Sequence, residues 1–307
     1  MEFSRLPRFK RAPTVAPIQL TERDRQIIRL VHRHRFLRSP HIVALLGGST
    51  QQVLRRLKSL YHHSYLERPR AQLDYYHQGG SRHIVYGLGD KGWELVKRER
   101  GIDFRNLSWS EKNRSVGRIF LEHAILVSDV MVALELACRH NGIRLLTEQE
   151  LALSSDAGRR LQLFRWRVKV NSRLQLGVVP DRVFALEFTD QAGNNQRTLF
   201  FLEADRGTMP VVRSNLSQTS FYRKLLAYEA TWSQGVHRSR FGFNRFRVLT
   251  VTTSAARVQS LVEACSKLKR GRGLFLFADR SVLKNPSGVL SASWQTGKPG
   301  EAGSLLT

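Results

Sequence analysis

Carboxylates occupy the ends of two predicted strands in the middle of the sequence. Asp181 begins a predicted strand over residues 181–188. Glu203 and Asp205 end the next predicted strand, over residues 197–205. The turn between them is rich in asparagine and glycine, which predicts an antiparallel hairpin that brings the acids to neighbouring strand ends. Carboxylates paired in this way are typical of enzymes that hold a divalent cation beside a phosphate.

The same acids also have a structural interpretation. Asp181 could cap the end of its strand, and Asp205 could form an ion pair with the adjacent Arg206 within a turn. Residue types alone do not decide between a metal-binding site and a structural use of these side chains, so both interpretations stay open at this point.

The rest of the chain is strongly basic, and this constrains its partner. The 307 residues include 50 Lys and Arg against 25 Asp and Glu, a formal net charge of +25. Such an excess favours nucleic acid or an anionic membrane surface as the partner. The membrane is disfavoured because no stretch approaches the roughly 18 apolar residues of a spanning helix. The sequence starts without the apolar core of a signal peptide, and its two distant cysteines predict a reducing, cytoplasmic setting.

Three helices followed by two strands are predicted over residues 20–100. Thr21 is suited to cap the first helix, and the second begins at Ser39, an N-cap followed by a proline. Two glycines separate the second helix from a third, which begins at about Ser49. This order, completed by two strands with a long basic loop, predicts a winged helix-turn-helix domain. A basic flexible arm, residues 1–19, is expected before it.

The third helix carries side chains that are expected to read DNA. Gln and Arg pair bidentately with adenine and guanine edges in the major groove, whereas arginines of the wing would contact the backbone. The apolar residues of this helix, Leu54 among them, are predicted to face inward. The candidate DNA-binding residues are Gln51, Gln52, Arg55, Arg56, Lys58, Arg68 and Arg82. The alternative is an ordinary solvated face on a three-helix bundle.

A second domain is predicted over residues 118–284, after a polar linker over residues 101–117. The expected order is a long helix, a strand, a hairpin, a helix, a strand, a helix and a final strand. This is the order of a restriction-endonuclease-like α/β sandwich with a mixed sheet. Residues 285–307 are predicted as a loosely ordered tail. The chain as a whole is therefore assigned to the α+β class.

Four short stretches carry a resemblance to a known family. They are Leu20-Thr21-Glu22-Arg23-Asp24, Pro180-Asp181, the block Leu202-Glu203-Ala204-Asp205-Arg206-Gly207-Thr208, and Lys224-Leu225-Leu226-Ala227-Tyr228. With them the chain resembles the bacterial replication-relaxation family, which is linked to plasmid replication and mobilisation. The likeness spans about residues 20–280, and the block from Glu203 to Thr208 is its specific part.

The resemblance implies a winged helix joined to a nuclease-like domain of the PD-(D/E)xK class. In that class an Asp after Pro and a Glu on the next strand hold magnesium, and Asp181 and Glu203 match these ligands. Asp205 stands where active members have a lysine, and a carboxylate cannot stabilise developing negative charge as a lysine does. Lys224, from the next helix, is the candidate to replace that lysine. Arg206 is a candidate phosphate contact.

Three functions follow as hypotheses. The leading one is a DNA-binding accessory protein of a plasmid or mobile element that assists replication, DNA relaxation or mobilisation. Its nuclease-like domain would be degenerate, and its partners would be double-stranded plasmid DNA and replication or relaxosome proteins. The second is a Mg²⁺-dependent endonuclease or nickase that uses Asp181 and Glu203, although Asp205 argues against it. The third is a winged-helix transcriptional regulator. The DNA site and the oligomeric state, a homo-oligomer included, stay open.

Overall fold

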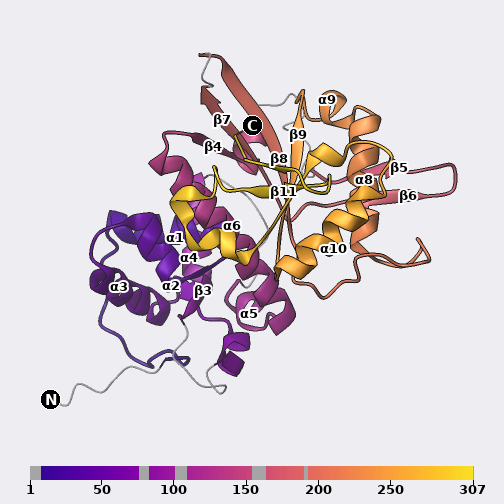
Figure 1. Cartoon of the computed structure of the whole chain (residues 1–307). Helices are drawn as coiled ribbons and strands as arrows, with labels where there is room; N and C mark the ends of the chain where they lie inside the picture. Colours follow the sequence, from indigo (N-terminus) through magenta and orange to yellow (C-terminus); the bar gives the residue numbers. More distant parts are fainter. Residues whose placement is uncertain (1–7, 76–82, 101–108, 154–163, 190–192, 307) are drawn as a thin grey trace. The chain divides into compact units, whose positions relative to one another are not determined.

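The protein folds as two units, seen here in a computed structural model. The units are Met1–Val132 and Ala133–Thr307 (Figure 1). Both contain helices and strands, which confirms the α+β class. The structure describes residues 8–75, 83–100, 109–153, 164–189 and 193–306.

The first unit surrounds a small antiparallel sheet of order β1-β3-β2 with helices. Its elements are α1 (Glu22–His34), β1 (Phe36–Arg38), α2 (Ser39–Leu46), α3 (Thr50–His62), β2 (Leu66–Glu67), the 3-10 helix η1 (Arg70–Tyr75), β3 (Val85–Leu88), α4 (Asp90–Arg100), α5 (Trp109–Arg114) and the first part of α6 (Arg118–His140). The order from α1 to β3 is the one predicted for a winged helix, with β1 as an additional short strand.

A capping box begins α1 and leads to an ion pair with α3. The Thr21 hydroxyl accepts a hydrogen bond from the Asp24 N–H, and the Asp24 carboxylate accepts one from the Thr21 N–H at 2.8 Å. Asp24 is fully buried and also accepts from Arg56 Nε at 2.8 Å. Burial alone would raise the pKa of Asp24, but the hydrogen bonds from Arg56 and Thr21 outweigh it and lower that pKa. The pair ties α1 to α3.

The segment before α1 is attached to the unit, whereas a flexible arm was expected there. The Arg11 side chain donates to the Tyr61 carbonyl at 3.1 Å, and the Ala12 N–H donates to His62 Nδ1 at 3.1 Å. Residues 8–19 are therefore an ordered part of the first unit, because their polar groups find acceptors on the end of α3. The remainder of the predicted arm lies outside the described residues.

The predicted linker also contributes to the first unit. Within α5, the Asn113 side chain donates to the Leu88 carbonyl at 2.8 Å, and the Ser110 N–H donates to Asp90 Oδ1 at 2.9 Å. The first part of α6 packs its buried side chains against β1 and β3. The observed division between the units therefore lies inside α6, later in the chain than predicted. Residues 101–108 lie outside the described part of the linker.

The second unit is built on a mixed sheet, as predicted, and this sheet has seven strands in the described part of the chain. Its order is β12-β11-β10-β9-β8-β7-β4, and β9 pairs in parallel with both β8 and β10. Its elements are β4 (Arg144–Thr147), α7 (Glu148–Leu153), β5 (Trp166–Lys169), β6 (Gln175–Val178), β7 (Arg182–Thr189), β8 (Asn195–Ala204), α8 (Phe221–Ser233), α9 (Val236–Ser239), β9 (Phe246–Thr252), α10 (Ala255–Ser266), η2 (Arg272–Leu274), β10 (Phe275–Asp279), η3 (Arg280–Lys284), η4 (Pro286–Gly288), β11 (Trp294–Thr296) and β12 (Ala302–Gly303).

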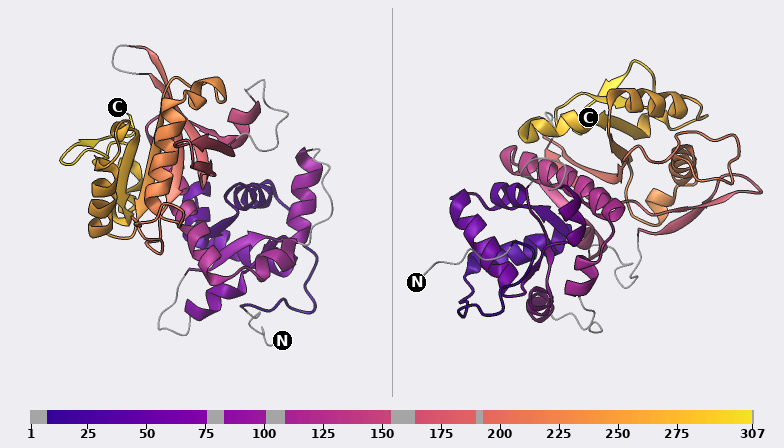
Figure 2. Two further views of the ribbon diagram at one scale, coloured as in Figure 1. Left: turned by 90° about the vertical axis from the view of Figure 1, so that its right-hand side faces the viewer. Right: turned by 90° about the horizontal axis from the view of Figure 1, so that it is seen from below.

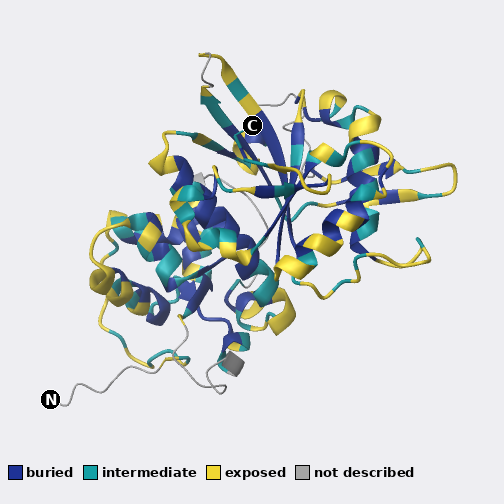
Figure 3. Ribbon diagram, viewed as in Figure 1, coloured by how far each residue is buried: buried dark blue, intermediate teal, exposed yellow. Residues whose placement is uncertain are grey.

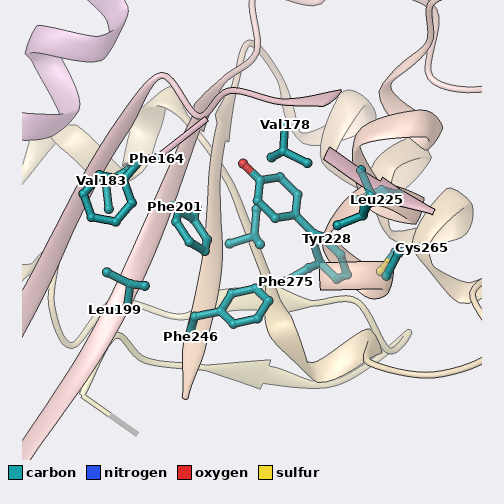
Figure 4. Packing of buried hydrophobic residues seen from close by; sticks show 14 of the residues in the cluster. Phe164, Val178, Val183, Leu199, Phe201, Leu225, Tyr228, Phe246, Cys265 and Phe275 are labelled. Carbon is teal, nitrogen blue, oxygen red and sulfur yellow. The ribbon is translucent and has the colours of Figure 1, made fainter. Parts of the chain in front are cut away.

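The main core of the second unit lies between this sheet and helices α8 and α10 (Figure 2). Leu199 and Phe201 of β8 point into it, and the β5–β6 hairpin adds Trp166 (Figure 4). Trp166 Nε1 donates to the Thr231 hydroxyl of α8 at 2.8 Å, so its polar atom is satisfied inside the core. Glu203 occupies the next alternate position of β8. The strand periodicity therefore directs its carboxylate toward the same side.

The C-terminal segment is ordered through residue 306, against the prediction of a loose tail over residues 285–307. Trp294 in β11 is fully buried, and its Nε1 donates to the Val289 carbonyl at 3.1 Å. Leu290 and Leu305 are buried as well. These anchors are spaced irregularly among glycines and serines, so they produce no periodic signal that would have predicted the short strands β11 and β12.

Replacing Arg56 with leucine tests the ion pair between α1 and α3. The change leaves the buried Asp24 carboxylate without its guanidinium, so we expect the first unit to lose roughly 3 kcal/mol of stability at pH 7. Hydrogen exchange of α1 and α3 peptides, measured by mass spectrometry, reports this loss for the first unit alone. Arg55→Leu is the matched control at an exposed neighbouring position and should cost less than about 0.5 kcal/mol. Equal losses in the two variants would contradict the role assigned to Arg56.

Candidate functional site

Strands β7 and β8 bring two of the predicted acids side by side. Their register pairs Arg182 with Leu202. It thereby places Asp181 opposite Glu203 at one end of the hairpin. The Asp181 N–H donates to the Leu202 carbonyl at 3.0 Å, and Asp181 Oδ2 accepts from the Ala204 N–H at 2.8 Å. Asp181 therefore extends the pairing of the strands, as the structural interpretation predicted, and it also lies beside Glu203.

Helix α8 holds the Glu203 carboxylate, of which only 2% is exposed. The Tyr228 hydroxyl donates to Oε1 at 2.5 Å, and the Lys224 ammonium contacts Oε2. Residues four apart lie on one face of a helix. The Lys-x₃-Tyr spacing therefore lets a single helix occupy both carboxylate oxygens. The ring of Tyr228 lies among apolar side chains of the core (Figure 4).

Burial dominates the electrostatics of this cluster. It raises the pKa of Glu203, an effect that Lys224 opposes and Asp181 reinforces. Burial would lower the pKa of Lys224, but the charges of Glu203 and Asp181 outweigh it and raise that pKa. The pKa of Tyr228 is raised well above its ordinary value by burial and then by Glu203. Tyr228 therefore stays a neutral donor near neutral pH, and Lys224 stays a cation that solvent still reaches through its 36% exposure.

Asp205 has a different environment from Glu203. Its Oδ2 accepts hydrogen bonds from Arg257 Nε and from the Thr252 hydroxyl, each at 2.8 Å, and its Oδ1 accepts from the Gly207 N–H at 3.1 Å. These contacts tie the end of β8 to β9 and α10. The structural interpretation therefore describes Asp205 well, although its ion-pair partner is Arg257 and not the adjacent Arg206. Arg206 itself is half-buried beside this turn.

The cluster of Asp181, Glu203 and Lys224 joins two carboxylates to one ammonium. Among the described residues, no group of three or more His, Cys, Asp or Glu side chains could hold a metal ion. Mg²⁺ commonly uses one or two carboxylates and completes its shell with waters and substrate phosphates. Asp181 and Glu203 are two such carboxylates, but Lys224 and Tyr228 engage both oxygens of Glu203, and the Ala204 N–H engages Oδ2 of Asp181. A Mg²⁺ here would have to displace one of these partners and take the rest of its ligands from water and phosphate. Lys224 would supply the positive charge that Asp205 cannot.

The outer face of α3 presents most of the predicted DNA-reading side chains. Exposed residues recur on this helix between its buried positions (Figure 3). Leu54 was expected inside but is 43% exposed, and so it joins this face. Positions three and four apart are neighbours on a helix surface, which places Leu54 between the polar residues of adjoining turns. The exposed polar residues are Gln51, Gln52, Arg55 and Lys58.

Two other predicted contacts lie elsewhere, and a third is not among the described residues. Arg56 belongs to the ion pair with α1 already described. Arg68 is buried, with its guanidinium 4.1 Å from the centre of the Tyr61 ring and its Nη2 3.2 Å from the Tyr86 hydroxyl. It stacks inside the first unit and does not reach outward as a wing residue would. Arg82 lies outside the described residues.

Sequence reasoning did not include Tyr228 and Arg257 in the acidic cluster. Tyr228 was named only in the stretch that carries the family resemblance, yet the Lys-x₃-Tyr spacing was a readable sign that both side chains share one face. Arg257 offers no such local sign, because α10 is distant from β8 in the sequence and comes next to its end only in the folded structure. Both residues bind carboxylates that were correctly singled out.

These features define an α+β protein with an exposed polar helix in one unit and a strand-end acidic cluster in the other. The chain matches the Replication-relaxation family over residues 28–245, which is more than half of its length. It therefore belongs to this family, as the resemblance predicted. No curated protein and no solved structure matches the chain. Within the described ranges, no helix is both long and apolar enough to cross a membrane.

The variant Lys224→Met removes the cation from Glu203 and keeps a similar chain length. At pH 8 it leaves a buried carboxylate uncompensated, so we expect a loss of about 2 kcal/mol, moderated because Lys224 is partly solvated. At pH 5 the loss should be smaller. The raised pKa of Glu203 lets the folded state bind a proton that the unfolded state binds less well, which favours folding at lower pH.

Urea denaturation at the two pH values measures this difference. Lys269→Met removes an exposed lysine from the same unit and serves as the control. A loss for Lys224→Met that is the same at pH 5 and pH 8 would show that Glu203 does not respond to the missing ammonium.

Proposed function

We propose that this protein is a DNA-binding accessory protein of a plasmid or mobile element, which assists replication, DNA relaxation or mobilisation. Membership of the Replication-relaxation family indicates a role related to replication or relaxation. The observation that carries DNA binding is the exposed face of α3, where Gln51, Arg55 and Lys58 lie on neighbouring turns. A net charge of +25 supports the same partner.

The chemistry of this face suits base recognition in a major groove. Gln and Arg offer the donors and acceptors that pair with adenine and guanine edges, and Lys58 can neutralise a phosphate. Leu54 adds an apolar group among them, of the kind that contacts a thymine methyl. An exposed leucine between polar neighbours is costly in water, whereas it is useful against a base edge.

The second unit would provide a further surface for DNA or for replication or relaxosome proteins. In this proposal the acidic cluster of the second unit has a structural role. Both oxygens of Glu203 are occupied by α8, and Asp205 is held by α10. The protein would act on double-stranded plasmid DNA in the cytoplasm.

Duplex binding should be steeply salt-dependent and should require the face of α3. Fluorescence anisotropy with a short duplex, at several NaCl concentrations, measures the slope that phosphate contacts produce. We expect the double variant Arg55→Ala/Lys58→Ala to weaken binding about tenfold or more and to flatten the slope, because it removes a base or phosphate contact of roughly 1–3 kcal/mol.

The control is Lys91→Ala, which removes an exposed charge from α4 of the same unit. It should change the affinity little. If Lys91→Ala weakened binding as much per charge as the α3 variant, binding would depend on general charge and not on this helix. Binding that does not change between low and physiological salt would remove phosphate contact as its basis.

A second candidate function is Mg²⁺-dependent nicking of DNA, and one observation favours it. The Lys224 ammonium reaches Glu203 from α8, next to Asp181 on the adjacent strand. An ammonium and two carboxylates are the groups that phosphate-ester cleavage uses to hold a metal and to stabilise developing charge. Asp181 and Glu203 would hold the metal, whose contribution would be to lower the pKa of a bound water, and Lys224 would stay protonated and face the phosphate.

Incubation with supercoiled plasmid and Mg²⁺ or Mn²⁺ decides between the two functions. If the protein is a nickase, Asp181→Asn and Glu203→Gln should each reduce nicking at least a hundredfold, whereas Glu263→Gln, an exposed acid on α10, should not. Absence of nicking by the wild-type protein, with salt-sensitive binding retained by both variants, leaves the accessory function and excludes the nickase.

A further inference from the structure

A basic cavity lies in the first unit, and none of the polar positions of α3 just described lines it. Its volume is about 270 Å³. Three separate parts of the chain form it: the segment before α1, the stretch from the end of α3 to η1, and α5. Its charged lining residues are Lys10, Arg11, Glu67, Arg68, Arg70 and Arg114. Five cations therefore surround one carboxylate.

That carboxylate is already shared between neighbouring groups. Glu67 is buried, and its Oε2 lies 2.9 Å from Arg11 Nη2 and 3.4 Å from Arg114 Nη2. Its Oε1 accepts a hydrogen bond from the Arg68 N–H at 3.0 Å. One negative charge thus serves two guanidinium groups and leaves the positive charge of the other three lining residues uncompensated.

Arg68 is the most enclosed of these cations and has an unused donor. Only 4% of the residue is exposed, and its guanidinium stacks on Tyr61. Its two terminal nitrogens donate to the Arg8 carbonyl and to the Tyr86 hydroxyl, but Nε has no acceptor among the described residues. A buried N–H group without an acceptor costs free energy, and in native proteins it commonly marks a bound ion, ligand or water.

The outer lining residues are exposed and available. Lys10 and Arg70 are solvent-exposed, and no side-chain hydrogen bond or ion pair is seen for either within the described chain. The pKa of the neighbouring His62 reflects the positive potential around the cavity. Burial, followed by the charges of Arg68 and Lys58, lowers the pKa of His62 to about 4.

We propose that this cavity binds a phosphate group. Arginine forks match the oxygens of phosphate, and the dianionic or diester group would offset charges that Glu67 leaves uncompensated. The volume is below the roughly 300–1,000 Å³ of pockets for drug-sized ligands, which fits a phosphate group better than a whole cofactor. The phosphate belongs either to a small molecule or to a DNA backbone, and the second case alone rests on the proposed function.

The first experimental arm uses free phosphate and the full-length protein. Thermal unfolding is followed while sodium phosphate or pyrophosphate replaces NaCl at constant ionic strength. A ligand that binds only the folded state raises Tm with concentration. For a small-molecule phosphate, we expect Tm to rise with either anion, and the apparent affinity to fall at least tenfold in Lys10→Gln/Arg70→Gln. These two exposed residues have no role in holding the fold.

The second arm uses a short duplex, measured by anisotropy. If the phosphate is that of a DNA backbone, Lys10→Gln/Arg70→Gln should weaken duplex binding at least tenfold with no phosphate-dependent rise in Tm. The matched control in the first arm is Arg55→Gln/Lys58→Gln, which removes the same number of charges from α3 and should leave the phosphate response intact. In the second arm that variant itself weakens binding, so the control there is Lys91→Gln/Arg98→Gln, which removes two exposed charges from α4 and should change the duplex affinity little. A failure of DNA recognition by α3 is thereby distinguished from a failure of this cavity.

One result overturns the proposal. If neither phosphate, pyrophosphate nor duplex distinguishes Lys10→Gln/Arg70→Gln from the wild-type protein, the cavity does not bind a phosphate group.

Discussion

The second unit depends on one physical constraint, which is that the Glu203 carboxylate is buried at the enclosed end of β8. β8 is enclosed from Thr198 to Ala204, so Glu203 has no route to water along its own strand. An uncompensated charge in that position would cost several kcal/mol. Lys224 and Tyr228 offset this cost together, and in doing so they fix both the position and the rotation of α8 over the sheet. The apolar face of α8 then packs on the core in one arrangement.

The two neighbouring carboxylates, Asp181 and Asp205, are stabilised by different partners. Asp181 satisfies a backbone N–H of the adjoining strand, and Asp205 joins the end of β8 to α10 through Arg257. Each carboxylate therefore orders a different junction of the sheet. The cation beside Asp181 and Glu203 is 36% exposed, whereas Arg257 beside Asp205 is 16% exposed. Lys224 therefore has the better access to an external group, next to two carboxylates on adjacent strands.

Sequence patterns predicted the features that depend on local spacing. The Thr21 cap, the three helices and the β7–β8 hairpin follow from short-range periods and turn residues. The meeting of Lys224 with Glu203 was expected from the family resemblance and not from local spacing. What could not be predicted depends on partners far away in the chain. The attachment of Arg11 to the end of α3 is of this kind, and so is the burial of Leu305 after β12. Neither position carries a periodic signal.

Charge on this protein is divided between structural and available cations, and adjacent residues can differ. Arg55 and Arg56 are neighbours in sequence, yet one helical step turns Arg56 toward the buried Asp24 and leaves Arg55 in solvent. Arg68 and Arg70 differ in the same way across the start of η1. A net charge of +25 therefore overstates the surface that can meet an anion. Cations that have no carboxylate partner within the described residues lie on α3 and around the basic cavity, and these are the ones available to an external anion.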